Sequence, residues 1–303
     1  MPRSIGLAHI VRLQDGTSEG VWGAYVLKSA FQPIYAFSDG KLSVAAFEGL
    51  LRPFRSALPQ RPQDFFLQVP AADRFHVETL ARTLHLLNAG AFLPRDKRIF
   101  VNFDPSLFGD RQLIDAVLRD MRLVLHEAQL DASRIVCEVT EQKSVFQETL
   151  RQFVDACRNH GFAIAVDDYG AEDSDMERVM ALRPDIVKFD ASWAKRLMDT
   201  EPGKALLSVM VEQFHGRGIG IVFEGLEEGW QLEVAEAVGA DMIQGFVLGR
   251  PELAPTSFAV SEHTDAQDAP KKGNPGSTPQ PAVASPLSQR RRQQTQFGRR
   301  FGG

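Results

Sequence analysis

Strand-like and helical patterns alternate between residues 25 and 258, and this alternation restricts the fold more than any other feature. Short apolar, β-branched and aromatic runs occur at residues 31–37, 42–50, 98–103, 134–140, 162–167, 185–189, 219–224 and 242–248. Helical patterns such as 144–160 and 204–215 separate them. This order predicts an α/β fold with a mostly parallel sheet. Eight strands in about 230 residues favour a (β/α)8 TIM-like barrel, with a doubly wound open sheet as the alternative.

Two helical segments have clear sequence signals. The segment 204–215 places four apolar residues on one predicted buried face: Leu206, Leu207, Met210 and Phe214. Pro202 suits the first turn of this helix and Gly216 its end. The pattern from Ser174 to Glu177 is a capping box that predicts the start of another helix, which Pro184 helps to end.

Polar residues follow seven of the apolar runs, at positions that a buried core would not favour. In a barrel, the carboxyl ends of the strands meet at one rim, where barrel active sites form. We therefore predict that these residues lie together: Glu48, Asn102, Glu138, Asp167 with Asp168, Lys188, Glu224 and Gln244.

The predicted cluster contains five carboxylates, which would repel one another without a compensating charge. Divalent cations supply that charge, and an all-oxygen ligand set suits Mg²⁺ or Mn²⁺ better than Zn²⁺. Adjacent carboxylates such as Asp167 and Asp168 can let one of them bridge two metals, as in two-metal phosphoryl hydrolysis. Lys188 could then position a water or stabilise the transition state. The alternative is a set of solvated strand ends joined by salt bridges.

The net charge of −5 averages two different segments. Residues 259–303 hold seven basic and three acidic residues, a net +4, which leaves −9 on the rest. This Pro-, Gly-, Ser-, Gln- and Arg-rich tail is predicted to be disordered. It is either simply solvated or a contact for an anionic membrane, nucleic acid or acidic partner. Only two cysteines occur, no membrane-spanning run or signal peptide is evident, and we expect a cytoplasmic protein.

Eight short motifs stand in order along the chain: FQPI at 31–34, EGLLR at 48–52, VNFDP at 101–105, EVTE at 138–141, DDYG at 167–170, DIVKFD at 185–190, EGLE at 224–227 and QGF at 244–246. They resemble the YQPI, EALLR, VNxSP, E[IV]TE, DDFG, DxxKID, EGVE and QGY/F motifs of EAL-domain cyclic-di-GMP phosphodiesterases, a bacterial (β/α)8-barrel family. The resemblance implies a lead-in at 1–24, a barrel at 25–258 and a tail at 259–303.

The same resemblance implies the chemistry and the residues that perform it. The expected activity is hydrolysis of cyclic di-GMP to linear pGpG with two Mg²⁺ or Mn²⁺ ions, in a homodimer. One metal would be held by Glu48, Asn102, Glu138 and Asp167, and the second by Asp167 and Asp168, largely through water. Glu224 and Lys188 would orient or deprotonate the attacking water, with Asp168 also counted as catalytic. The nucleotide would contact Gln32, Leu50, Arg52 and Gln244, and the rim and its loops would be supported by Glu141, Glu227 and Asp190.

Four positions depart from the family pattern. Gly49 replaces an alanine, Asp104 replaces a serine, and the loop after Gly170 carries Glu172 and Asp173 where the family has Gly and Tyr. In the family this loop couples the second metal site to dimerisation. Two alternatives to an active enzyme therefore stay open. The barrel could bind cyclic di-GMP without hydrolysing it and signal through a partner, or it could act as a protein-interaction module only.

Overall fold

A closed ring of strands forms the centre of the molecule. The computed structural model describes residues 6–38, 41–140, 147–171 and 176–258. Within these residues the ring runs β3, β4, β6, β7, β8, β9, β10, β11 and returns to β3. The strands are β3 (Tyr25–Ser38), β4 (Lys41–Arg55), β6 (Arg98–Phe103), β7 (Ile135–Thr140), β8 (Ala163–Tyr169), β9 (Ile186–Phe189), β10 (Gly220–Phe223) and β11 (Met242–Ile243). Each of the eight apolar runs contributes one of these strands, so the barrel prediction is confirmed.

The ring differs from a strict (β/α)8 repeat at its first strand. All neighbouring pairs from β4 to β11 are parallel, but β3 is antiparallel to both β4 and β11. Only two residues separate β3 from β4, which permits a hairpin but not a helical crossover. The last run is also shorter than predicted, because β11 ends at Ile243.

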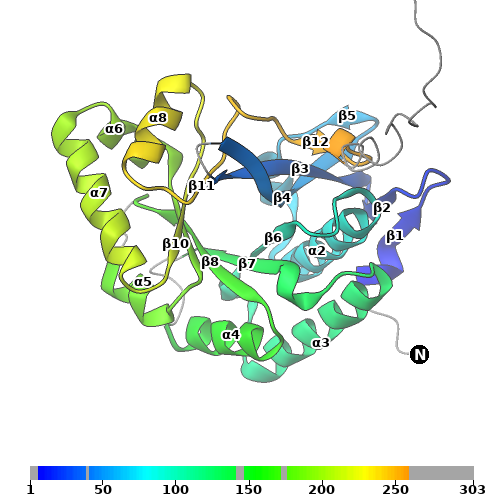
Figure 1. The fold of residues 1–303 in the computed structure, drawn as a ribbon. Coiled ribbons are helices and arrows are strands. Elements are labelled where there is room, and N and C mark those ends of the chain that lie inside the picture. The colour runs from blue at the N-terminus through cyan, green and yellow to red at the C-terminus, as the bar shows by residue number, and fades with distance from the viewer. Residues whose placement is uncertain (1–5, 39–40, 141–146, 172–175, 259–303) are drawn as a thin grey trace, which may run out of the picture. The chain divides into compact units, whose positions relative to one another are not determined.

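The helices lie on the outside of the ring (Figure 1). They are α1 (Pro62–Gln68), α2 (Ala71–Phe92), α3 (Arg111–Glu127), α4 (Gln147–Asn159), α5 (Met176–Leu182), α6 (Ala191–Met198), α7 (Glu201–His215) and α8 (Gly229–Ala237). Short strands extend the sheet beyond the ring: β1 (Ile10–Arg12), β2 (Ser18–Trp22), β5 (Leu58–Pro59) and β12 (Glu252–Leu253). The start of the capping box predicted at Ser174 lies outside the described residues.

Two layers of side chains fill the inside of the barrel. The lower layer is an apolar cluster: Ile34, Ala46, Phe100, Val136, Ala165, Ile186 and Val222. Two residues nearer the carboxyl-end rim, the same strands carry the polar residues Gln32, Glu48, Asn102, Glu138, Asp167, Lys188 and Glu224. Because strand side chains alternate between faces, residues two apart share the inner face. The apolar layer thus supports a polar layer at the rim.

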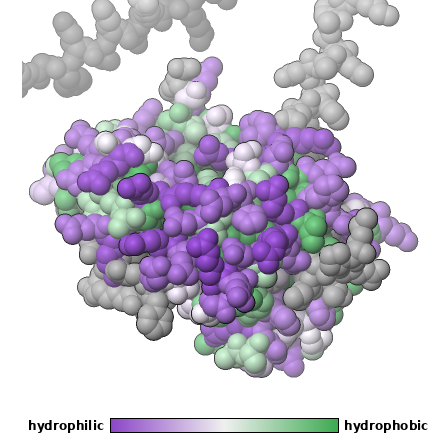
Figure 2. All heavy atoms as spheres, turned by 90° about the horizontal axis from the view of Figure 1, so that it is seen from below, coloured by the Kyte–Doolittle hydropathy of each residue, from purple (hydrophilic) through white to green (hydrophobic). Residues whose placement is uncertain are grey.

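Large apolar side chains are exposed at scattered positions on the surface of the described residues. On the face drawn in Figure 2, hydrophilic side chains predominate and apolar ones occur in small groups. No helix among the described residues is long and apolar enough to cross a membrane.

Helix α7 offers a direct test of the packing. The predicted buried face is correct for Leu207 and Phe214, which are fully buried, but wrong for Leu206, which is 47% exposed. We expect Leu207→Ala to lower the free energy of unfolding by about 2–5 kcal/mol, because it leaves a cavity. The matched control Leu206→Ala should change it by less than about 0.5 kcal/mol. Urea denaturation measures both, and equal effects would contradict this packing.

Candidate functional site

Lys188 lies at the centre of the polar layer and contacts four carboxylates. Its Nζ is 2.5 Å from Glu138 Oε1 and 2.6 Å from Glu224 Oε1. Asp167 Oδ1 is 3.2 Å away and Glu48 Oε2 is 3.6 Å away. The ammonium group is almost fully buried, with 1% of the side chain exposed. The structure therefore brings side chains from β4, β7, β8 and β9, and from the residue after β10, to one point, as the strand-end pattern predicted.

Burial and mutual repulsion change the proton affinities at this point. Burial raises the pKa of Glu138 well above its usual value, more than the attraction of Lys188 lowers it. Burial also raises the pKa of Glu224 to about 8, with Asp167 and Glu48 adding to the shift and Lys188 opposing it. For Lys188 burial lowers the pKa, but the surrounding carboxylates outweigh burial and raise it overall. The lysine therefore stays charged, whereas Glu224 can exchange a proton near neutral pH.

A local irregularity brings both adjacent aspartates to the rim. Regular alternation would point Asp167 and Asp168 to opposite faces of β8. The register with β9 instead shifts by one residue between Val166 and Tyr169, and Asp168 has a left-handed backbone with φ 58°. Such a bulge redirects a side chain at a strand end. As a result, carboxylate oxygens of Asp167, Asp168 and Glu224 lie within 4.8 Å of one another.

Gly170 allows the turn after these aspartates. Its φ is 97°, and a Cβ at this position would lie 2.3 Å from Cδ2 of Trp193. Both the backbone conformation and the space therefore require glycine. The loop residues Glu172 and Asp173 and the predicted loop anchor Glu141 lie outside the described residues.

A first cavity of about 360 Å³ opens on one side of the cluster. It is lined by Gln32, Glu48, Asp168, Asp190, Lys195, Glu224, Glu227, Gln244 and Phe246, among others. Gln244 Nε2 donates a hydrogen bond of 2.8 Å to Glu48 Oε2, and Gln32 Nε2 donates one of 3.2 Å to the Gly249 carbonyl. These bonds hold Gln32 and Gln244, two residues predicted to contact the nucleotide, at the cavity wall.

The two predicted rim supports have defined partners. Asp190 caps α6, where its Oδ1 accepts a 2.8 Å hydrogen bond from the backbone N–H of Trp193. Glu227 forms a 3.3 Å ion pair with Lys195. Both acidic residues also line the first cavity, so the residues that support the rim form part of the cavity wall.

A second cavity, of about 570 Å³, opens between β4, α2 and β6. The predicted residues Leu50, Arg52 and Asn102 line it. Asn102 pairs in register with Glu138 on the neighbouring strand, although it is not among the described partners of Lys188. Burial lowers the pKa of Arg52, while Glu48 partly restores it. The second cavity thus adjoins the cluster through the residues that follow Glu48 on β4 and through Asn102, the neighbour of Glu138.

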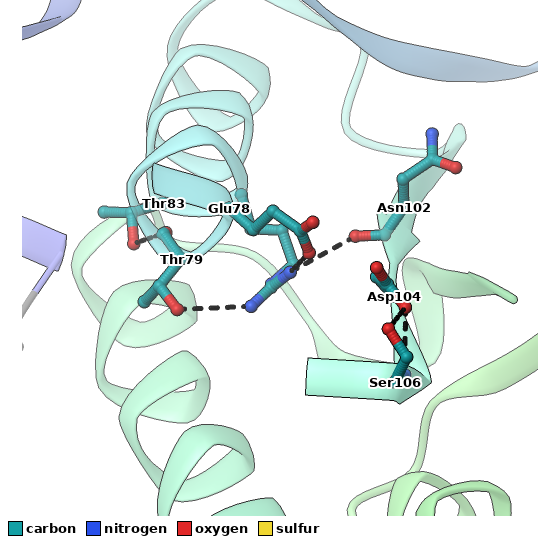
Figure 3. Close-up of polar contacts among 7 residues, drawn as sticks. Glu78, Thr79, Thr83, Asn102, Asp104 and Ser106 are labelled. Atoms are coloured by element: carbon teal, nitrogen blue, oxygen red, sulfur yellow. Dashed lines mark hydrogen bonds and ion pairs between the residues drawn. The ribbon is translucent and has the colours of Figure 1, made fainter. Parts of the chain in front are cut away.

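Helix α2 supplies side chains to the second cavity that the strand-end argument missed. Arg82 is buried, lies 3.6 Å from Glu78, and donates a hydrogen bond to the Asn102 carbonyl. Figure 3 shows Glu78 on α2 pointing toward Asn102 of β6 and Asp104 just after it, with Thr79 farther from them. His85 lines the same cavity. A signal was present: polar residues recur along one side of an otherwise apolar helix.

The donor set suits a hard divalent cation. Glu138 Oε2 is buried without a hydrogen-bond partner in the described part of the chain, and Lys188 is the charge partner of Glu138 Oε1 and Asp167 Oδ1. Buried carboxylates without donors are costly unless a cation lies beside them. All candidate ligands are oxygens, as Mg²⁺ and Mn²⁺ prefer. The group formed by Asp167, Asp168 and Glu224 meets the same requirement.

Comparison with known proteins identifies the family. The model of the EAL domain matches residues 25–251, and the chain belongs to this family. Cyclic di-GMP phosphodiesterase RocR of Pseudomonas aeruginosa is 26% identical over 260 residues, covering 83% of this chain and 63% of RocR. The matched regions span only 15–63% of the first four curated relatives.

Two solved structures with bound nucleotide share the fold. The EAL-domain protein YkuI of Bacillus subtilis, in complex with c-di-GMP and calcium, is 26% identical with a TM-score of 0.64. The calcium/cy-diGMP complex of Klebsiella pneumoniae BlrP1 is 25% identical with a TM-score of 0.63. Each match covers 75% of this chain and 56% of the other.

The raised pKa of Glu224 predicts a pH dependence of stability. A carboxyl whose pKa rises from 4.5 to about 8 on folding binds more protons in the folded state. Stability from this group is therefore greatest below pH 4.5 and is lost as the pH rises to about 8. In EDTA, we expect Glu224→Gln to reduce the fall in melting temperature between pH 6 and pH 9. The exposed control Glu236→Gln should keep the wild-type slope, and an unchanged slope in Glu224→Gln would refute the assignment.

Proposed function

We propose that this chain hydrolyses one phosphodiester bond of cyclic di-GMP to give linear pGpG. The observation that carries the proposal is the cluster around Lys188, with four carboxylates within 3.6 Å of its Nζ at the mouth of an EAL barrel. The two cavities lined by rim residues support the same conclusion, since a cyclic dinucleotide presents two bases beside its phosphates. The bound nucleotide in two EAL-domain relatives is consistent with this substrate class.

The proposed metal ligands are the oxygen donors of the polar layer. Glu48, Asn102, Glu138 and Asp167 would hold one Mg²⁺ or Mn²⁺, and Asp167 and Asp168 would contribute to a second. When bound, these cations supply charge neutralisation for the phosphate and make a water more acidic.

Glu224 and Lys188 are the proposed reacting pair. Glu224 accepts the proton of the attacking water, and its raised pKa of about 8 suits a base that works near neutral pH. The oxygen of the water attacks phosphorus, one P–O bond to the ribose breaks, and the leaving ribose oxygen takes up a proton from solvent. Lys188, 2.6 Å from Glu224, holds that carboxylate in place and offsets negative charge as the reaction proceeds.

The substrate contacts are proposed from the two cavity walls. Arg52 offers a planar fork of donors that matches a phosphate, and Leu50 lies beside it. Gln32 and Gln244 would orient the nucleotide on the side of the first cavity.

We also propose a homodimer in the cytoplasm, and an anionic or protein partner for the basic tail. Sedimentation with and without residues 259–303 tests the assembly.

Activity assays test the proposed base. Glu224→Gln keeps the shape of the side chain but loses the base, and we expect hydrolysis to fall by about 10²–10⁴-fold. The exposed control Glu127→Gln should retain wild-type rates, because it lies away from the cluster in an ion pair with Arg12. Chromatography of cyclic di-GMP and pGpG measures both.

If the wild-type protein forms no pGpG from cyclic di-GMP while a control phosphodiesterase does, the proposed enzymatic activity is rejected. Binding without turnover under those conditions would favour the receptor alternative.

Removal of metal gives a second test. We expect EDTA to abolish hydrolysis and added Mg²⁺ or Mn²⁺ to restore it, because the single ammonium of Lys188 cannot balance the four carboxylates around it. Glu48→Ala should lower the activity and raise the Mg²⁺ or Mn²⁺ concentration needed for half-maximal hydrolysis. Undiminished hydrolysis in EDTA would exclude the proposed role of the carboxylates as metal ligands.

A further inference from the structure

A chain of buried hydrogen bonds connects β2 to the second cavity. Asn88 on α2 is fully buried, and its Oδ1 accepts a 2.8 Å hydrogen bond from the Ser18 N–H. Its Nδ2 donates to the Ser18 carbonyl at 2.9 Å and to Ser29 Oγ at 3.2 Å. The two opposite bonds to Ser18 fix the orientation of the amide. Ser29 Oγ in turn lies 2.8 Å from Nδ1 of His85.

This chain determines which nitrogen of His85 carries the proton. The Ser29 hydroxyl accepts a hydrogen bond from Asn88 and still has its own proton to donate. Among the described residues, Nδ1 of His85 is the acceptor within reach of that hydroxyl proton. Ser29 therefore donates to Nδ1, which leaves the proton of the neutral ring on Nε2. Burial, with Arg52 and Arg82 adding to it, lowers the pKa of His85 to about 3, so the ring stays neutral.

The Nε2–H of His85 is the free end of the chain. No hydrogen bond to Nε2 is found within the described residues, although the residue is only 4% exposed and lines the second cavity. The ring packs beneath Gly49, where a Cβ would lie 3.0 Å from both Cβ and Cγ of His85. Gly49 therefore leaves room for the imidazole directly beside the strand that carries Glu48 and Arg52.

The rest of the cavity has the character of a site for a nucleobase. Leu50, Phe66 and Phe103 supply apolar wall, while Glu78 and Asp104 lie on the α2–β6 side. Of the two arginines that also line the cavity, Arg82 pairs with Glu78 and Arg52 is the proposed phosphate contact, while the carboxyl groups can accept N–H groups. A neutral donor on one side and acceptors on another match guanine, which has the acceptor O6 on one edge and N–H donors nearby.

We propose that His85 is a specificity-determining residue whose Nε2–H donates a hydrogen bond to O6 of a guanine base in the second cavity. This inference rests on the proposed function, because cyclic di-GMP supplies the base. Adenine carries an amino donor in place of O6, so two donors would face each other and His85 would select against it. The Ser18–Asn88–Ser29 chain positions the ring by fixing its tautomer.

The test compares two cyclic dinucleotides in one protein. Calorimetry with Mg²⁺, in the Glu224→Gln background to slow turnover, gives Kd for cyclic di-GMP and cyclic di-AMP. We expect His85→Phe to reduce the preference for cyclic di-GMP about tenfold, the value of one buried hydrogen bond. His85→Gln should keep most of it, because its amide presents a donor near the Nε2 position.

The possible outcomes separate the two proposals. If the background protein binds neither dinucleotide, the proposed function fails. If it binds cyclic di-GMP and His85→Phe leaves the preference unchanged, only the role of His85 fails. Should His85→Phe not fold, nitrogen NMR of the histidines in the background protein decides. The His85 signals, assigned with His85→Gln, must show the Nε2–H tautomer and must shift more with cyclic di-GMP than with cyclic di-AMP. An Nδ1–H tautomer or equal shifts would overturn the inference.

Discussion

The ion-pair cluster of Lys188 is the constraint on which the rest of the site depends. One ammonium group contacts the carboxylates of Glu48, Glu138, Asp167 and Glu224 inside a barrel that excludes most water. One positive charge cannot balance four negative ones, so burial forces some of these carboxyls to hold protons or to bind further cations. The same imbalance that costs stability supports the proposed divalent-metal site.

The apolar layer inside the barrel packs against the polar layer and holds its charged side chains in place. Directly below the polar residues, Phe100, Val136 and Val222 belong to the apolar layer that fills the interior. Side chains fixed by packing from below need little reorganisation when a ligand arrives. The bulge at Asp168 is the exception in this regular pattern, and it adds a second carboxylate beside Asp167 at the rim.

Polar residues on α2 extend the site beyond the strand ends. Arg82 connects the helix to the backbone of Asn102, and Asn88 connects β2 to Ser29 and so to His85. β2 precedes the region that the family model matches, yet its backbone at Ser18 anchors this chain of hydrogen bonds. The space left by Gly49, where the family motif has alanine, is the space against which His85 packs.

The sequence by itself predicted the eight strands and, for a barrel, the convergence of Glu48, Glu138, Lys188 and Glu224 at one rim, because side chains alternate along a strand and parallel strands end at one edge. Closure into a barrel rather than an open sheet was decided by the tertiary structure. The sequence could not predict the hairpin geometry of β3, the exposure of Leu206 or the contacts of His85. Those depend on how separate elements approach one another in space, which local patterns do not encode. Tertiary structure decided which polar side chains share a cavity, because Ser18, Ser29 and Asn88 meet only when β2, β3 and α2 pack together.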